Sequence, residues 1–163
     1  MKFNKKEVTM AEEEKLEEQL KDYKTKVATV TKGRLDWDKD LIFVGRTQRG
    51  YEIEFDAKVE WGCMPTESLL LSLGGCLAID VVAFLQKMRC KIDRFWMELE
   101  GERNPTPPQY YKAIKIVLHI NGENLTDKKV QRAINLSQQK YCSVRHSLRP
   151  DLKVTIEYRL NEG

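Results

Sequence analysis

Apolar residues recur along this chain with periods that change from segment to segment, and each change predicts a different element. Residues 11–23 are mostly charged helix formers, and their apolar side chains, Leu16, Leu20 and Tyr23, recur at i, i+4 and i+7. This narrow stripe predicts a solvated helix with one edge that docks on another surface. We expect residues 1–9, which precede the helix, to be disordered.

Three short segments with strand character follow this helix. Residues 26–33 are rich in Val and Thr, residues 41–46 form an apolar run, and residues 51–55 alternate between apolar and acidic side chains. Such sequences are typical of strands. Asp and Gly residues at 36–39 and 47–50 predict the two turns. The pattern indicates a meander of three antiparallel strands.

The next apolar segment has a helical period and predicts the central helix of the fold. Pro65 restricts the entry, Thr66 can cap the helix, and Glu67 suits the positive charge of a helix N-terminus. The helix is expected to continue to about Arg89. Because its middle is apolar almost all the way round, we expect strands, a second long helix or a second subunit to cover every side. Gly74-Gly75 within it indicates close packing, with space for a substrate as the alternative.

The C-terminal part of the chain predicts two strands, a helix and a last strand. These elements are residues 92–100, residues 110–120, a helix that is capped by Thr126 or Asp127 and runs to about Cys142, and residues 152–160. Asn121-Gly122 predicts a turn after the second strand. Strands grouped ahead of helices favour an α+β fold with antiparallel pairing over a doubly wound parallel sheet. We divide the chain into a charged N-terminal extension and helix, residues 1–24, and one α+β domain, residues 25–163.

Composition and charge exclude several classes of function. The 28 basic and 25 acidic residues leave a net charge of +3, and no basic stripe is interleaved with aromatic residues, so we expect no nucleic-acid partner. The apolar run at residues 69–85 is shorter than the ~20 residues that span a bilayer, so we expect no membrane partner. The charged N-terminus is unlike a signal peptide. These features predict a cytoplasmic protein, in which thiols stay reduced unless they are catalytic.

Two of the four cysteines lie in distinctive positions. Cys76 follows Gly74-Gly75, eleven residues after Pro65, and Cys142 lies within Lys140-Tyr141-Cys142-Ser143-Val144 at the end of the later helix. Together with the order of strands and helices, this arrangement resembles the OsmC/Ohr family, named for osmotically inducible protein C and organic hydroperoxide resistance protein. The resemblance covers residues 26–160.

The resemblance implies a fold, an assembly and a chemistry. The fold would be OsmC-like, with antiparallel sheets wrapped around two long central helices in an intertwined homodimer, and the active sites would lie at the subunit interface. Cys76 would attack a peroxide, Cys142 would resolve the product as a disulfide, and a dithiol reductant would restore both thiols. No cofactor and no metal are implied.

The activation of Cys76 requires a cation, because the reactive form of a cysteine is the thiolate. Cys76 lies about ten residues into its helix, too deep for the helix N-terminus to contribute much. In the peroxide-reducing branches of the family, an arginine held by a glutamate directly after the helix-opening proline has this role. Here Thr66 follows the proline, and Glu67 comes one residue later, rotated by about 100° around the helix. The candidate cations are Arg34, Arg46 and Arg49, and we prefer Arg46 because it closes a strand.

The remaining candidate residues have simpler interpretations. Asp80 lies one turn beyond Cys76 on the same face, where an unpaired carboxylate would disfavour a thiolate, so we expect it to be hydrogen-bonded. Cys63 and Cys90 have no partner by any spacing rule and are interpreted as structural. The spacing between Cys142 and His146 is a weak signal for a metal site.

Three functions remain open at this point. The first is thiol-dependent reduction of organic or hydrogen peroxides through Cys76 and Cys142, in defence against oxidative stress. The alternative is a non-catalytic OsmC-like protein that senses redox state or holds a small apolar ligand, and the missing glutamate after Pro65 favours it. Hydrolase or acyl-transfer chemistry through Cys76 would need a histidine base that its helix does not offer.

Overall fold

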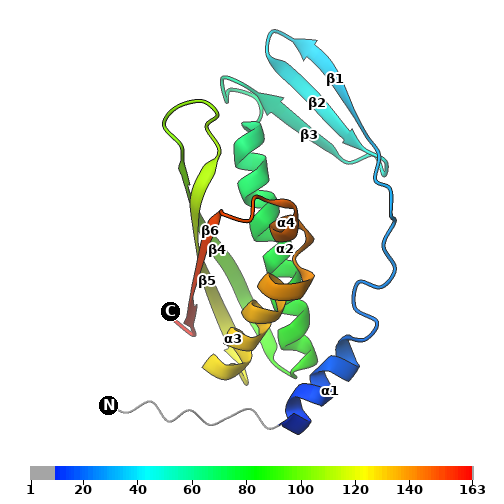
Figure 1. The fold of residues 1–163 in the computed structure, drawn as a ribbon, viewed down its shortest axis with the longest axis vertical. Helices are drawn as coiled ribbons and strands as arrows, with labels where there is room; N and C mark the ends of the chain where they lie inside the picture. Colours follow the sequence, from blue (N-terminus) through cyan, green and yellow to red (C-terminus); the bar gives the residue numbers. More distant parts are fainter. Residues whose placement is uncertain (1–9, 163) are drawn as a thin grey trace.

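The computed structural model describes residues 10–162, and the expected disorder of residues 1–9 lies outside this part of the chain. The fold is α+β, as predicted, with two three-stranded sheets and a long central helix (Figure 1). In chain order the elements are α1 (Met10–Leu20), β1 (Gly33–Lys39), β2 (Ile42–Thr47), β3 (Glu52–Asp56), α2 (Pro65–Lys87), β4 (Lys91–Arg103), β5 (Tyr111–Glu123), α3 (Asp127–Leu136), the π-helical turn η1 (Ser137–Tyr141), α4 (Ser143–Ser147) and β6 (Lys153–Leu160).

The first sheet is the predicted antiparallel meander, in the order β1-β2-β3. Its first strand was placed wrongly, because residues 26–32 form no strand and β1 begins at Gly33. Residues 36–39, predicted as a turn, belong to β1, and the chain reverses at Asp40, whose φ is +46°. The Val- and Thr-rich segment has strand propensity, but within residues 10–162 no strand pairs with it to receive its backbone hydrogen bonds.

The second sheet has the order β4-β5-β6 and differs from the prediction in the direction of its last strand. β4 and β5 form the expected antiparallel hairpin, whereas β6 runs parallel to β5. The expectation of purely antiparallel pairing is therefore wrong, because the chain crosses over through α3 before it returns as β6. The turn predicted at Asn121-Gly122 is also wrong, since both residues lie within β5 and the chain turns at Asn124, with φ +61°.

α2 is the central helix, and it packs against β4 on one side and α3 on another. Its N-cap is Met64 with Pro65 as the first helical residue, so Thr66 is not the cap. A Cβ at Gly74 would lie 2.6 Å from a methyl carbon of Leu99 on β4, whereas a Cβ at Gly75 would meet nothing within 4 Å. Gly74 therefore serves close packing, as predicted, and Gly75 lies on an open face.

One face of α2 is uncovered in the single chain. Leu71 and Ile79 are 61% and 65% exposed, so the expectation that the helix is enclosed on every side is not met by one copy of the chain alone. By length and composition the helix could cross a membrane. However, its opposite face is buried in the core and carries Asp80, which has hydrogen-bond partners from other segments, so we interpret α2 as a core helix.

The helix predicted to run to Cys142 is divided into three parts. Thr126 caps α3, and its hydroxyl accepts a hydrogen bond from the Lys129 N–H. The α-helix ends at Leu136, where η1 begins with a wider turn, and the N–H of Cys142 donates to the Ser137 carbonyl at 2.8 Å. Cys142 itself has an extended backbone and precedes α4. Single π turns of this kind are frequent at functional sites.

α1 docks as its apolar stripe predicted. Leu16 and Leu20 are 4% and 2% exposed and belong to the core. The helix ends at Leu20, and the ring of Tyr23 then packs edge-on against Phe84 of α2 and Tyr141 of η1. The segment that follows α1 is thereby held against the C-terminal half of the central helix.

Candidate active site at Cys76 and Cys142

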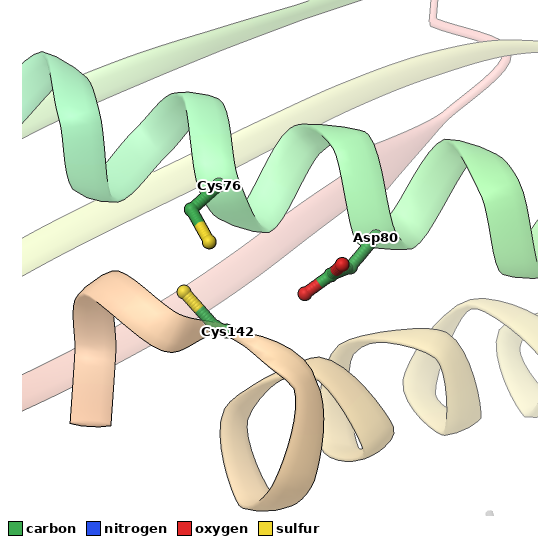
Figure 2. Close-up of side chains that lie close together, drawn as sticks. All are labelled: Cys76, Asp80 and Cys142. Carbon is green, nitrogen blue, oxygen red and sulfur yellow. The ribbon is translucent and has the colours of Figure 1, made fainter. Parts of the chain in front are cut away.

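The two cysteines singled out in the sequence lie next to each other. Cys76 projects from α2 toward Cys142, which follows η1, and Asp80 lies one helical turn beyond Cys76 (Figure 2). The two Sγ atoms and a carboxylate oxygen of Asp80 all lie within 4.8 Å of one another. Both cysteines are free thiols. The sulfurs of a disulfide lie about 2.05 Å apart, so these two sulfurs must move closer together to form one.

The two thiols differ in their surroundings. Cys142 is 1% exposed, whereas Cys76 is half-buried. Burial raises the pKa of Cys142 to about 11, against the partial opposition of the Arg145 N–H, which donates to its sulfur at 3.4 Å. The neighbouring Cys76 and Asp80 add to the increase in this pKa. Cys142 is therefore a neutral thiol near pH 7, and Cys76 is the more accessible of the two sulfurs.

Asp80 is fully buried and satisfied by hydrogen bonds, as predicted. The Tyr23 hydroxyl donates to Oδ1 at 2.7 Å, and the Ser137 hydroxyl donates to Oδ2 at 2.8 Å. The ammonium group of Lys24 also lies 2.6 Å from Oδ1. Burial, followed by the contact with Asp80, raises the pKa of Tyr23, so its hydroxyl remains a donor. A buried carboxylate is stable only with such partners.

Lys24 is a cation of this site that the sequence did not reveal. Besides its ion pair with Asp80, its Nζ donates to the carbonyl oxygen of Tyr141 at 2.9 Å, directly before Cys142. The backbone of Lys24 is left-handed, with φ +57°, and this sharp turn after α1 directs the side chain inward. The stripe of Leu16, Leu20 and Tyr23 predicted that α1 docks, but no periodic signal marks Lys24.

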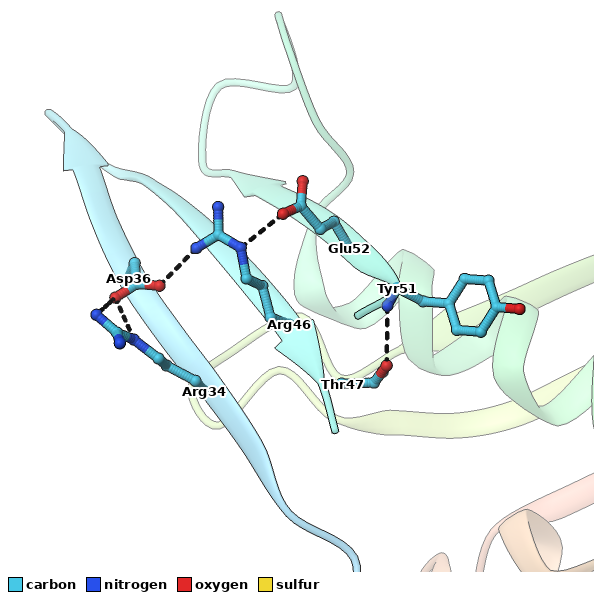
Figure 3. Close-up of polar contacts among 6 residues, drawn as sticks. All are labelled: Arg34, Asp36, Arg46, Thr47, Tyr51 and Glu52. Carbon is cyan, nitrogen blue, oxygen red and sulfur yellow. Dashed lines mark hydrogen bonds and ion pairs between the residues drawn. The ribbon is translucent and has the colours of Figure 1, made fainter. Parts of the chain in front are cut away.

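The structure places the preferred arginine elsewhere in the single chain. Arg46 lies on β2, where its guanidinium contacts Asp36 and Glu52, both at 2.6 Å (Figure 3). Arg34 pairs with the same Asp36. Glu67 accepts a hydrogen bond from the Met64 N–H at 2.8 Å and so caps the start of α2. Neither Arg46 nor Glu67 is brought to the cysteines by these contacts.

The other cysteines and histidines have separate surroundings. The thiol of Cys90 is buried and donates to the Asn124 carbonyl, and burial raises its pKa. Cys63 donates to the Glu54 carbonyl in the loop before α2. His146 is exposed on α4, outside the group formed by Cys76, Asp80 and Cys142. That group has the residue types of a metal site, but both carboxylate oxygens already bind protein donors, which fits thiol chemistry better.

Comparison with known proteins identifies the family. A family model described as OsmC-like protein matches residues 55–157. Protein YhfA of Escherichia coli K12 is 34% identical over 128 residues, which cover 78% of this chain and 96% of YhfA. The chain belongs to the OsmC-like family. The resemblance drawn from the two cysteine motifs is thereby confirmed.

Solved structures of other proteins have a similar fold. The crystal structure of a hypothetical protein from Aquifex aeolicus VF5 is 31% identical, with a TM-score of 0.72, and the match covers 83% of this chain and all of that one. The organic hydroperoxide resistance protein OhrB of Bacillus subtilis is 14% identical, with a TM-score of 0.55 over 80% of this chain and 98% of that one, and shows the shared fold alone. Each of these matches leaves part of this chain outside the shared region.

The raised pKa of Cys142 predicts a specific loss of stability at high pH. The neutral thiol of Cys142 stabilises the folded state fully below the ordinary pKa of 9.0, and this stabilisation is lost as the pH rises through the folded-state pKa of about 11. Between these two pH values, Cys142 ionises in the unfolded chain but stays protonated in the folded one, so the unfolded state is favoured. Wild type should lose about 2–3 kcal/mol more than Cys142→Ala over this window. Urea unfolding at a series of pH values measures the difference, with Cys63→Ala as the control. Parallel curves for wild type and Cys142→Ala would contradict it.

Proposed function

We propose that this OsmC-like protein is a homodimeric, thiol-dependent peroxidase that reduces hydrogen peroxide or small organic hydroperoxides. Cys76 is the attacking cysteine and Cys142 the resolving one. The observation that carries the proposal is the contact between an accessible sulfur and a buried neutral one, with their Sγ atoms within 4.8 Å. Family membership supports it, because the family also includes organic hydroperoxide resistance proteins.

The reaction would use the two thiols in sequence. The thiolate of Cys76 attacks the terminal oxygen of the peroxide, the O–O bond breaks, and the leaving alkoxide takes a proton to become an alcohol. The sulfenic acid on Cys76 then reacts with the thiol of Cys142, so that an S–S bond forms and water leaves. A dithiol reductant, itself oxidised to a disulfide, returns both cysteines to thiols. The short distance between the sulfurs favours the second step over further oxidation of Cys76.

The thiol pair can be tested with one equivalent of cumene hydroperoxide. Peptide mapping of the wild-type protein by mass spectrometry should show a disulfide between Cys76 and Cys142. Cys142→Ser should instead accumulate a sulfenic acid on Cys76 that dimedone traps, and Cys76→Ser should consume peroxide at least about a hundredfold more slowly. Cys90→Ser removes a buried thiol outside the pair and should behave as wild type.

Two results would decide against the peroxidase. Unchanged thiols after treatment would remove the basis of the proposal, as would peroxide consumption by Cys76→Ser at the wild-type rate. A disulfide that forms without turnover in the presence of dithiothreitol would favour the redox-sensing alternative.

Lys24 is proposed as the cation that keeps the site suitable for a thiolate. Its charge balances that of Asp80, which would otherwise repel a second negative charge on Cys76. We expect Lys24→Gln to react with peroxide about tenfold more slowly at pH 7, and the loss should shrink as the pH rises. Stopped-flow measurement of the reaction from pH 6 to 10 tests this. Lys26→Gln removes the same charge from the exposed segment after α1 and serves as the control; equal rates for both variants would exclude the role of Lys24.

The homodimer is proposed because the single chain leaves apolar surface uncovered. Leu71 and Ile79 are exposed on α2. Trp37 on β1 and Trp61 in the loop after β3 are 67% and 72% exposed. Exposed apolar surface of this kind is typical of subunit interfaces. A second copy that covers this face of α2 would also bring another first sheet toward the cysteines, and only in such an assembly does Arg46 remain a candidate cation.

The apolar face of α2 provides the test of this assembly. Ile79→Asp should convert a dimer to a monomer, because it places a charge in a desolvated interface. Sedimentation equilibrium measures the mass, and Val27→Asp, at an equally exposed apolar position before β1, is the control. A wild-type protein that is monomeric at micromolar concentration would contradict the proposal.

A further inference from the structure

A cavity that is separate from the cysteine site lies where the ends of three helices meet. Neither Cys76 nor Cys142 lines it. Figure 1 shows α1, the C-terminal end of α2 and the N-terminal end of α3 side by side. The cavity has a volume of about 330 Å³. Volumes of about 300–1,000 Å³ are typical of small-molecule sites. Its lining residues are Lys15, Leu16, Gln19, Lys87, Met88, Arg89, Thr126, Lys128, Lys129 and Arg132.

The lining of this cavity is strongly basic. Among the described residues that line it, six are Lys or Arg and none is Asp or Glu, in a chain with 28 basic and 25 acidic residues overall. Basic residues at the C-terminal end of α2 match the negative end of a helix macrodipole and need no ligand. Lys129 lies in the first turn of α3, where the macrodipole is positive and cations are unfavourable unless an anion is near. Lys128 in the same turn and Arg132 each already interact with other residues.

Two lysines of the cavity are held in position by backbone oxygens. Lys87 Nζ donates to the Gln19 carbonyl at 2.8 Å, and Lys129 Nζ donates to the Asn124 carbonyl at 3.0 Å. An ammonium group has three N–H donors, so each of these contacts leaves two for a ligand. The carboxylate of Asp127, the acidic residue in the first turn of α3, accepts a hydrogen bond from Tyr158 on β6 and does not line the cavity.

We propose that this cavity binds a small organic phosphate of nucleotide size. Lysine ammonium groups are common ligands of phosphate oxygens. The apolar side chains of Leu16 and Met88 line the same cavity and provide a surface for the non-ionic part of the ligand. Because α1 forms one wall, binding stabilises the docked position of this helix. The cavity can bind this ligand whether or not the protein is a peroxidase.

The experiment is isothermal titration calorimetry of the full-length protein with ADP, inorganic phosphate and adenosine. ADP should bind, and more weakly as salt is raised from 50 to 200 mM; phosphate should bind more weakly than ADP, and adenosine not measurably. Lys87→Gln/Lys129→Gln should weaken ADP binding at least tenfold. Lys87→Arg keeps the positive charge and should bind ADP as wild type does. Lys26→Gln/Lys153→Gln removes the same two charges at exposed lysines outside the cavity and is the control for net charge.

Further readouts separate binding from folding. Thermal unfolding without ligand should give the double variant nearly the wild-type midpoint, and ADP should increase the protection of α1 backbone amides from hydrogen exchange in wild type only. No ADP binding at millimolar concentration would overturn the proposal. So would equal ADP affinity in the double variant, or adenosine binding as tightly as ADP. Phosphate binding as tightly as ADP would contradict the proposal that the cavity also contacts the organic part of the ligand.

Discussion

The buried carboxylate of Asp80 is the constraint on which the site depends. A charge that is fully removed from water costs several kcal/mol unless donors surround it. Its partners come from two segments that are both 57 residues away, with Tyr23 and the neighbouring Lys24 on one side and Ser137 on the other. To satisfy this one group, the segment after α1 and the start of η1 must both close on α2. Cys76 lies one turn away on the same face of α2, so the arrangement that satisfies Asp80 also forms the thiol site.

The π turn η1 allows the same segment both to hydrogen-bond Asp80 and to place Cys142 beside Cys76. Residues five apart lie about 140° apart around an α-helix, on different faces. In η1 the Cys142 N–H bonds to the carbonyl of Ser137, five residues earlier. The Ser137 hydroxyl can therefore reach Asp80 while the sulfur of Cys142 faces Cys76. The same geometry buries Cys142 and raises the pKa of its thiol, whereas Cys76 on α2 is only half-buried.

Local patterns predicted the parts of the fold that local physics determines. The apolar run from Pro65 and the alternation of the β4–β5 hairpin were sufficient for the α+β class. The pairing of Cys76 with Cys142 was implied by the resemblance to the OsmC/Ohr family. The parallel partner of β6 was not predictable, because alternation along a strand is the same in either direction of pairing. Residues 26–32 had strand composition, but no local signal shows whether a neighbouring strand exists to accept their hydrogen bonds.

The cation of the site shows the limit of transfer by resemblance. The family pattern favoured Arg46 as the cation of the site. Within one chain, however, Arg46 forms ion pairs with Asp36 and Glu52, and the cation beside Asp80 is Lys24. The position of the Lys24 ammonium group depends on the left-handed backbone of Lys24 itself, and no sequence pattern marks that conformation. A cation on a docked terminal segment also differs physically from one on a sheet. If α1 leaves the core, Asp80 loses its ammonium partner and becomes hydrated at the same moment, so the electrostatics of the cysteine pair and the docking of α1 are parts of one equilibrium.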